Sequence, residues 1–336
     1  MNSLILPKDY CSAIDLMESQ RAIKKIKDYF QQELAYGLNL RRVSAPLFVD
    51  PRTGLNDNLN GVERRVDFTL KGIDEMHVEI VQSLAKWKRM ALGKYGIEPG
   101  HGIYTDMNAI RRDEDLDNLH SVYVDQWDWE KVITKEQRSE EYLKETVTTI
   151  YNAVKNLGDY VNRLYRDIQT EIPNEIFFIT TRELEAMYPD LTPKEREDAI
   201  TKEHGAVFIM KIGGRLASGE KHDGRSPDYD DWELNGDIIL WNEVLDRAFE
   251  ISSMGIRVDS EAMKRQLEAE GCPERAELDF QKAVIEDRLT YTIGGGIGQS
   301  RLCMFFLRKA HIGEVQVSVW PEEMIKECEA HNIHLL

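Results

Sequence analysis

Apolar residues recur along this chain at helical spacings, and two stretches show the pattern best. Between about residues 14 and 35 they return every three, four or seven positions, which predicts an amphipathic helix that Gly37 ends. The same period predicts a long helix at about 139–168. Further helices are predicted at 83–95, 193–203, 259–270, 274–288 and 299–308.

Alternating polar and apolar residues predict the strands, most clearly at 120–130. There Gln126 and Asp128 fall on one face, and Trp127 and Trp129 fall on the other. Further strands are predicted at 38–48, 78–81, 175–180, 206–212, 236–241 and 247–252.

The strand predicted at 38–48 contains Pro46, which cannot donate a ladder hydrogen bond, so we expect this strand at an edge or an interface. Where the polar motifs gather, strands outnumber the helices between them. This favours an α+β fold, an antiparallel β-sheet flanked by helices, over a ladder of parallel strands. We find no internal repeat and no linker rich in proline or serine, so residues 1–336 are predicted to form a single domain.

The 336-residue chain is acidic, with a formal net charge of −17. An acidic surface repels a phosphate backbone, which argues against a nucleic-acid partner. The four cysteines are scattered without a C-x-x-C pair, as expected in a reducing cytoplasm, and no apolar run approaches the length of a membrane span. We therefore expect a cytoplasmic protein without nucleic-acid or membrane partners.

Residues Tyr291–Arg301 carry the most informative motif, in which four glycines precede Arg301 and an apolar helical run. The glycines leave room for a planar ring against the backbone, because they have no Cβ. Arg301 would lie at the start of a helix, near the positive end of its dipole, where a polyphosphate binds well. The motif is not a dinucleotide fingerprint, because Gln299 stands where the third glycine would be. The alternative is a glycine turn before a packed helix.

A second motif places Arg111 two residues before Asp113, shortly upstream of the strand predicted at 120–130. The guanidinium would grip the α-phosphate of ATP, and the acid would order it or reach the adenine amino group. The alternative is a solvated run of charged residues.

Gln126 and Asp128 form a third signal, since an amide and a carboxylate two residues apart on one strand face can hold an ammonium group. Ser83 suits the N-cap of the helix predicted at 83–95, and Lys88, more than a turn inside it, would cross to a substrate carboxylate. The alternatives are an amphipathic strand with its tryptophans in the core, and an ordinary surface lysine.

Asp237 and Glu250 are candidate ligands for Mg²⁺, because acidic residues at strand ends near a polyphosphate site offer hard oxygen atoms. Asp228, Asp230 and Asp231 lie in the same acidic region, and at least one of them is expected to cap a surface turn instead.

Together these motifs resemble the ammonia-dependent asparagine synthetases, or aspartate–ammonia ligases, over nearly the whole chain. The segment ending at Arg301 resembles motif 3 of the class II aminoacyl-tRNA synthetases, with Ser300 where that pattern usually has glutamate. Arg111 and Asp113 resemble motif 2, with Asp113 in place of glutamate. Longer matching strings lie at 53–61, 83–89, 119–130, 228–232, 252–257 and 294–301.

The resemblance implies the class II aminoacyl-tRNA synthetase catalytic-core fold and a homodimer built on the first helix and the strand with Pro46. It implies ATP, Mg²⁺, L-aspartate and ammonia. Aspartate would be activated as β-aspartyl-AMP with release of diphosphate, and ammonia would then displace AMP to give asparagine. Two alternatives stay open: a relative that transfers the activated amino acid to RNA or protein, and a regulator that has lost catalysis.

The resemblance also assigns roles by position. Aspartate binding falls to Asp57, Ser83, Lys88, Gln126, Asp128 and Asp230. ATP binding falls to Arg111, Asp113, Ser121, Arg225, Ser253, Gly294, Gly295, Gly296 and Arg301. Catalysis falls to Asp57, Arg111 and Arg301, and metal binding to Asp237 and Glu250. Because ammonia is mostly protonated at neutral pH, a carboxylate must take its proton, and Asp57 is the first candidate, with Asp230 second.

Overall fold

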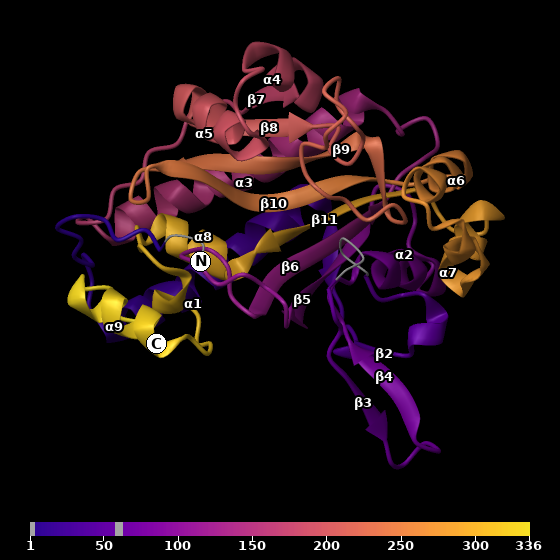
Figure 1. Cartoon of the computed structure of the whole chain (residues 1–336), viewed down its shortest axis with the longest axis horizontal. Coiled ribbons are helices and arrows are strands. Elements are labelled where there is room, and N and C mark those ends of the chain that lie inside the picture. The colour runs from indigo at the N-terminus through magenta and orange to yellow at the C-terminus, as the bar shows by residue number, and fades with distance from the viewer. Residues whose placement is uncertain (1–3, 58–62) are drawn as a thin grey trace.

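A mixed β-sheet forms the centre of the structure, a computed structural model that describes residues 4–57 and 63–336 (Figure 1). Within these residues the sheet has eight strands in the order β1-β5-β6-β11-β10-β9-β8-β7. β1 runs parallel to β5 and β7 runs parallel to β8, whereas every pair between them is antiparallel. The strands are β1 (Leu40–Arg42), β5 (Gly102–Ile110), β6 (Tyr123–Val132), β7 (Phe177–Thr180), β8 (Ala206–Met210), β9 (Asp230–Asn242), β10 (Arg247–Arg257) and β11 (Thr292–Gly298). The predicted α+β fold is confirmed, with one parallel pair added at each edge.

Helices α1 (Leu16–Leu38), α3 (Glu140–Leu164) and α8 (Gln299–Phe306) pack with one face of the sheet around the main hydrophobic core. Trp127 and Trp129 of β6 are fully buried in this core, so the predicted alternation of β6 is confirmed. The buried residues of α1 and α3 return at helical spacing, because only one side of each helix meets the core.

The opposite face of the sheet is covered towards its edges. α5 (Pro193–His204) packs on β8, β9 and β10, and α4 (Thr181–Met187) packs against β7 and α5. α2 (Ala85–Lys94) packs beside β5 and β6 on the other side. α6 (Ser260–Ala269) and α7 (Asp279–Ile285) pack together near α2 (Figure 1). The polar positions of the central strands point into the space between these helices.

A smaller sheet projects from the body at the bottom of the view (Figure 1). It contains β2 (Phe48–Val49), β4 (Met76–Ile80) and β3 (Asp67–Leu70), in that order. The remaining elements are the 3-10 helices η1 (Pro51–Thr53), η2 (Pro273–Glu277) and η3 (Ile312–Glu314), and the helix α9 (Glu322–Ala330). In the described part of the chain, no helix is both long and apolar enough to cross a membrane.

Gly37 does not end the first helix, as the sequence predicted, but lies inside α1. A Cβ at Gly37 would lie 3.1 Å from Cγ2 of Thr149, so the glycine lets α1 approach α3 closely. The helix continues to Leu38, and Asn39 caps it in a left-handed conformation with φ 58°.

Two predicted elements are divided in the structure. The strand predicted at 38–48 becomes β1 and β2, which belong to different sheets, and Pro46 lies between them. β1 is nevertheless an edge strand, as the proline suggested. The helix predicted at 274–288 becomes η2 and α7. Ser83 is not the N-cap of α2, since Leu84 holds that position, although the Ser83 Oγ accepts a hydrogen bond from the Ala85 N–H at 3.2 Å.

The glycine motif is neither a turn nor a loop but the central strand β11, paired with β6 on one side and β10 on the other. Gly294 lies opposite Glu130, and Gly296 lies opposite Asp128. Gly295 faces the other way, towards the buried core, where it lies opposite Met254. Glycine has a low strand propensity, so the extended conformation of β11 depends on its hydrogen bonds to the two neighbouring strands.

Gly295→Ala should lower the free energy of unfolding by about 1–3 kcal/mol, because the added carbon has no room. It would lie 2.5 Å from the Met254 Cβ and 2.7 Å from the Ser253 carbonyl oxygen, which belong to a neighbouring strand that cannot shift freely. Gly93→Ala in α2 is the matched control. Among the described residues no heavy atom lies within 4 Å of its new Cβ, and alanine should stabilise the helix by about 0.5–1 kcal/mol. Chemical denaturation of both variants tests this, and equal effects of the two would contradict it.

Candidate active site

A cavity of ≈ 400 Å³ lies over the middle of the sheet, on the face opposite the main core. The strands alternate, so the same pattern that buries Trp127 and Trp129 turns Gln126 and Asp128 into the cavity. Most of the predicted site residues line it: Asp57, Ser83, Arg111, Asp113, Ser121, Gln126, Asp128, Arg225, Asp230, Glu250, Ser253, Gly295, Gly296 and Arg301. Lys88, Asp237 and Gly294 are not among the lining residues, although each lies close beneath or beside them.

The glycines of β11 make room for side chains from the neighbouring strands. A Cβ on Gly296 would collide with the carboxamide of Gln126, which therefore lies over the glycine. A Cβ on Gly294 would collide with the carboxylate of Glu130 and would lie 2.5 Å from Nη2 of Arg257. The space that the sequence assigned to a planar ring is thus partly filled by the protein's own polar groups.

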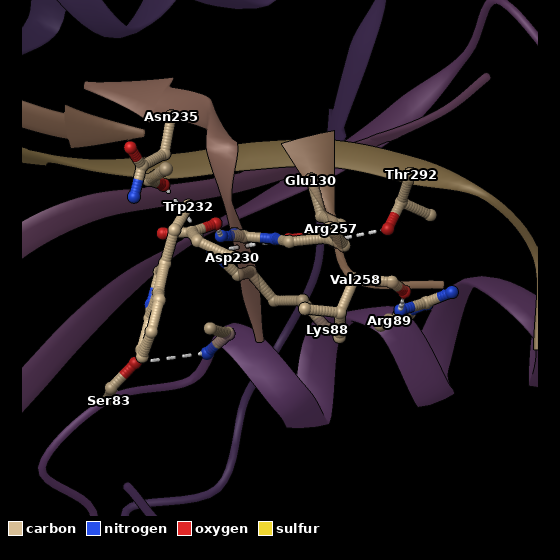
Figure 2. Close-up of polar contacts among 12 residues, drawn as sticks. Ser83, Lys88, Arg89, Glu130, Asp230, Trp232, Asn235, Arg257, Val258 and Thr292 are labelled. Carbon is tan, nitrogen blue, oxygen red and sulfur yellow. Dashed lines mark hydrogen bonds and ion pairs between the residues drawn. The ribbon is translucent and has the colours of Figure 1, made fainter. Parts of the chain in front are cut away.

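Arg257 is the site residue that the sequence-based assignment missed (Figure 2). Its guanidinium lies between two carboxylates and is 2% exposed. Nη2 donates to Glu130 Oε2 at 2.7 Å, Nε donates to Glu130 Oε1 at 3.0 Å, and Nη1 donates to Asp230. Thr292 donates to Glu130 Oε1 at 2.7 Å. The signal was present, since Arg257 follows Ser253 at even spacing on β10 and therefore faces the cavity.

The charges of this cluster support one another. Burial lowers the pKa of Arg257, but Asp230 and Glu130 outweigh it and raise the pKa above the ordinary value, so the guanidinium stays charged. Burial raises the pKa of Glu130, and Arg257 more than reverses this rise. Arg257 therefore presents a fixed positive charge to the cavity, held by carboxylates on β6 and β9.

Lys88 lies in the floor of the cavity rather than reaching across it. Its ammonium is 1% exposed, forms an ion pair with Asp128, and donates to the Trp129 carbonyl at 2.9 Å. It also lies 3.4 Å from the Gly295 carbonyl oxygen. In this arrangement Lys88 orients Asp128, and contact with a substrate carboxylate stays a prediction.

Two arginines offer unpaired donors to the cavity. The Nε atoms of Arg111 and Arg225 are buried and have no hydrogen-bond partner among the described residues. Glu250 orients Arg301, because the Arg301 Nη1 donates to the Glu250 carbonyl at 3.0 Å and lies 3.5 Å from the Glu250 carboxylate. Buried guanidinium donors without protein partners are suited to an anionic ligand such as a phosphate.

Asp113 is already engaged by another residue. Arg64 donates to its carboxylate from Nε at 3.0 Å and from the backbone N–H at 2.7 Å. These hydrogen bonds lower the pKa of Asp113 to about 2. The carboxylate therefore stays ionised at the mouth of the cavity, where it orders the segment that carries Arg111.

Asp237 and Glu250 form an acidic pair on adjacent strands beside the arginines. Asp237 is paired with Arg225 through one oxygen, whereas its buried Oδ1 has no partner among the described residues. Burial raises the pKa of Asp237 to about 7, and the charge of Glu250 adds to the rise. No group of three or more histidine, cysteine or acidic side chains in the described chain is arranged to hold a metal ion. The unpartnered Asp237 oxygen, on a carboxyl whose pKa is raised, nevertheless fits a cation whose other ligands are phosphate oxygens.

Asp57 stands at the edge of the cavity and is 1% exposed. Asn56 positions it, because the Asn56 Oδ1 accepts hydrogen bonds from the backbone N–H of Asp57 at 3.0 Å and of Gln82 at 2.9 Å. The matched segment 53–61 continues past Asp57, and its residues 58–61 lie outside the described part of the chain.

Solved structures of aminoacyl-tRNA synthetases share this fold. The asparaginyl-tRNA synthetase of Entamoeba histolytica, in complex with asparaginyl-adenylate, matches with a TM-score of 0.60 at 13% identity over 90% of this chain and 66% of the synthetase. That of Pyrococcus horikoshii, also complexed with asparaginyl-adenylate, has a TM-score of 0.60 at 15% identity over 90% of this chain and 70% of the synthetase. The chain thus spans about two thirds of these proteins and has the fold of a class II synthetase catalytic core.

Sequence comparison narrows the class to one family. Residues 17–332 match the family described as aspartate-ammonia ligase. The aspartate–ammonia ligase of Ruminiclostridium cellulolyticum is 63% identical over 336 residues, covering 100% of both chains. That of Clostridium tetani is 64% identical over 333 residues, covering 99% of this chain and 98% of the relative. The chain belongs to the aspartate–ammonia ligase family.

Glu130→Gln should lower the free energy of unfolding by about 3–5 kcal/mol, because it removes one charge from a buried pair and leaves Arg257 incompletely compensated. Glu286→Gln is the matched control. Glu286 pairs with Arg288 at 2.7 Å, but their side chains are 46% and 55% exposed, so its loss should change stability by no more than about 1 kcal/mol. Urea denaturation at neutral pH measures both, and a Glu130 variant as stable as its control would contradict the role of this cluster.

Proposed function

We propose that this chain is an AMP-forming aspartate–ammonia ligase that makes L-asparagine from L-aspartate, ammonia and ATP. One observation carries the proposal. A single cavity is lined by Arg111 and Arg225, whose Nε atoms have no partner in the described part of the chain, and by the amide–carboxylate pair Gln126 and Asp128. The first set suits a polyphosphate and the second suits the ammonium group of an amino acid. Full-length similarity to aspartate–ammonia ligases supports the same conclusion.

The first step joins the two substrates. An oxygen of the aspartate β-carboxylate attacks the α-phosphorus of ATP, forms β-aspartyl-AMP, and breaks the bond to the diphosphate leaving group. Placement and neutralisation of charge lower the barrier of such a transfer. Arg111 and Arg301 would neutralise the phosphate oxygens, and Gln126, Asp128 and Ser83 would hold the aspartate.

The second step replaces AMP by nitrogen. Ammonia attacks the acyl carbon, the new C–N bond forms, the C–O bond of the mixed anhydride breaks, and AMP leaves. The attacking nitrogen gives up a proton, which a carboxylate takes. Asp57 is the first candidate for this base. Asp230 is second, because Arg257 already holds its carboxylate.

Asp237 and Glu250 would hold Mg²⁺ together with phosphate oxygens. Bound there, the ion would neutralise charge on the phosphates. The orphaned Asp237 Oδ1 and the raised pKa of that carboxyl support the assignment.

We also propose a cytoplasmic homodimer built on α1 and the segment that follows it. β1 is an edge strand of the large sheet. Leu16 and Met17 at the start of α1 and Tyr36 near its end are 55%, 62% and 88% exposed, and a partner that packs along α1 would cover them. The four cysteines are all free thiols, which suits a reducing compartment.

A direct assay tests the proposed reaction. The chain is incubated with ATP, Mg²⁺, L-aspartate and ammonium, and AMP and asparagine should appear in equal amounts. Glutamine should not replace ammonium: Cys272, Cys303 and Cys328 are buried, and burial raises the pKa of each thiol, so they are poor nucleophiles. Asparagine formation from glutamine in ammonia-free buffer, or transfer of labelled aspartate to tRNA instead of asparagine formation, would contradict the proposal.

Arg301→Ala should reduce the rate of adenylate formation on the order of 10²-fold or more, because it removes charge that stabilises the transition state. Aspartate-dependent exchange of labelled pyrophosphate into ATP measures this step without ammonia. Arg288→Ala is the control, since Arg288 lies on the surface with its side chain 55% exposed and should leave the exchange rate unchanged. A folded Arg301 variant with normal exchange would remove Arg301 from the mechanism.

Asp57→Asn should separate the two steps if Asp57 is the base. Pyrophosphate exchange should persist, whereas asparagine formation should slow and recover as pH rises, because free ammonia then replaces the lost proton acceptor. If Asp57 instead anchors the aspartate amine, the substitution should raise the KM for aspartate and impair both assays. Equal losses at every pH would leave Asp57 as a binding residue only.

A further inference from the structure

Gln82 lies at the wall of the cavity, and its carboxamide has no hydrogen-bond partner within residues 4–57 and 63–336. The residue is 0% exposed and lines the cavity beside Ser83. Neither its Nε2 nor its Oε1 has a hydrogen-bond partner among the described residues. Leaving a buried amide unpaired costs about 1–3 kcal/mol, so a fold that keeps one in a cavity wall provides for a ligand there.

The backbone of Gln82 is fixed against the segment that carries Asp57. The Asn56 Oδ1 accepts hydrogen bonds from the backbone N–H groups of Asp57 and Gln82. The Asn56 Nδ2 donates to Glu79 Oε2 at 3.1 Å and to the Ile80 carbonyl at 3.2 Å. The Asn56 Oδ1 therefore joins the backbones of Asp57 and Gln82, and the Nδ2 attaches both to β4. The unpaired amide is part of a rigid wall rather than a loose surface side chain.

The charges around this corner select the chemistry of the ligand. Asp57, Tyr229 and Asp230 line the same cavity. Burial and the charges of Asp57 and Asp230 raise the pKa of Tyr229 far above its ordinary value, so its phenol stays neutral. Asp230 is paired with Arg257, whereas the Asp57 carboxylate and the neutral Tyr229 phenol favour an N–H donor over an anion.

The substrates of the proposed reaction contain two nitrogen groups that fit, the α-ammonium of aspartate and ammonia itself. The α-ammonium already has partners in Gln126 and Asp128, which lie on β6 in the middle of the sheet. Gln82 follows β4 and reaches the cavity from its side wall. The second nitrogen is therefore the better match for the unpaired amide.

We infer that Gln82 binds the nitrogen substrate, with its Oε1 accepting a hydrogen bond from an N–H of ammonia. The inference rests on the proposed function. The hydrogen bond holds the nitrogen so that its lone pair faces the acyl carbon; the C–N bond forms, a carboxylate takes the released proton, and AMP leaves with the electrons of the broken C–O bond. Gln82 is thus a specificity residue for the second step and has no part in adenylate formation.

Steady-state kinetics of Gln82→Leu test the inference. The KM for ammonium should rise on the order of tenfold, while pyrophosphate exchange and the KM for aspartate stay within about twofold of the wild type. The melting temperature should not fall, because leucine replaces an amide that makes no hydrogen bond to any residue the structure describes. Thr201→Val is the matched control. Thr201 is also 0% exposed, and its side-chain oxygen has no partner among the described residues, but it lies outside the cavity. The KM for ammonium of this variant should therefore be unchanged.

Gln82→Glu is a second test variant, because it keeps the side-chain length and an acceptor oxygen. Its KM for ammonium should stay within a few-fold of the wild type. An unchanged KM for ammonium in Gln82→Leu would overturn the inference, as would a rise in the KM for aspartate or an equal loss in Gln82→Glu. Failure of the proposed function is separate, since the wild-type chain would then make no asparagine at all.

Discussion

Arg257 can join β10 to β6 only because the strand between them has no side chain at the crossing point. β11 separates the two strands, and Gly294 lies where a Cβ would collide with Glu130 and press on the guanidinium. The ion pair between Arg257 and Glu130 therefore depends on a glycine in the middle of the sheet. The same constraint acts one repeat along the strand, where Gly296 leaves the space that the Gln126 carboxamide occupies. The polar floor of the cavity therefore exists because Gly294 and Gly296 have no side chains.

This arrangement places costly features at the centre of the molecule. A strand of glycines has little intrinsic preference for the extended state, and buried charges lose the solvation that they have in water. Each cost is offset by a neighbour: β6 and β10 hold the glycines on both sides, and Arg257 is matched by carboxylates of β6 and β9. The opposite face of the same strands carries Trp127, Trp129 and the apolar side of the helices, and this burial stabilises the platform on which the polar face is built.

Several buried polar atoms that have no hydrogen-bond partner among the described residues belong to side chains in or beside the cavity. Among the described residues, the buried Nε atoms of Arg111 and Arg225, one carboxylate oxygen of Asp237 and the carboxamide of Gln82 have no hydrogen-bond partner. Positive donors, an acidic pair and a neutral amide correspond to a phosphate, a cation and a small nitrogen nucleophile. The cavity thus divides into chemically distinct corners, and the proposed reaction needs all of them. Asp113, which lines the cavity, and Lys88, which lies beneath it, differ from these residues because other side chains already engage them.

The sequence by itself determined the features that depend on local order along the chain. Periodicity located α1, α3 and β6, and alternation along β6 already put Gln126 and Asp128 on the face opposite the tryptophans. Residue type and motif order singled out Arg111 and Arg301, the family resemblance added Arg225, and all three line one cavity. Only the tertiary structure decided that the glycine motif is a central strand, that Lys88 lies under Asp128, and that Arg257 and Gln82 belong to the site. The reason is that these features depend on which strands become neighbours and in what register, and hydrogen bonds between distant segments set that register, which no local pattern contains.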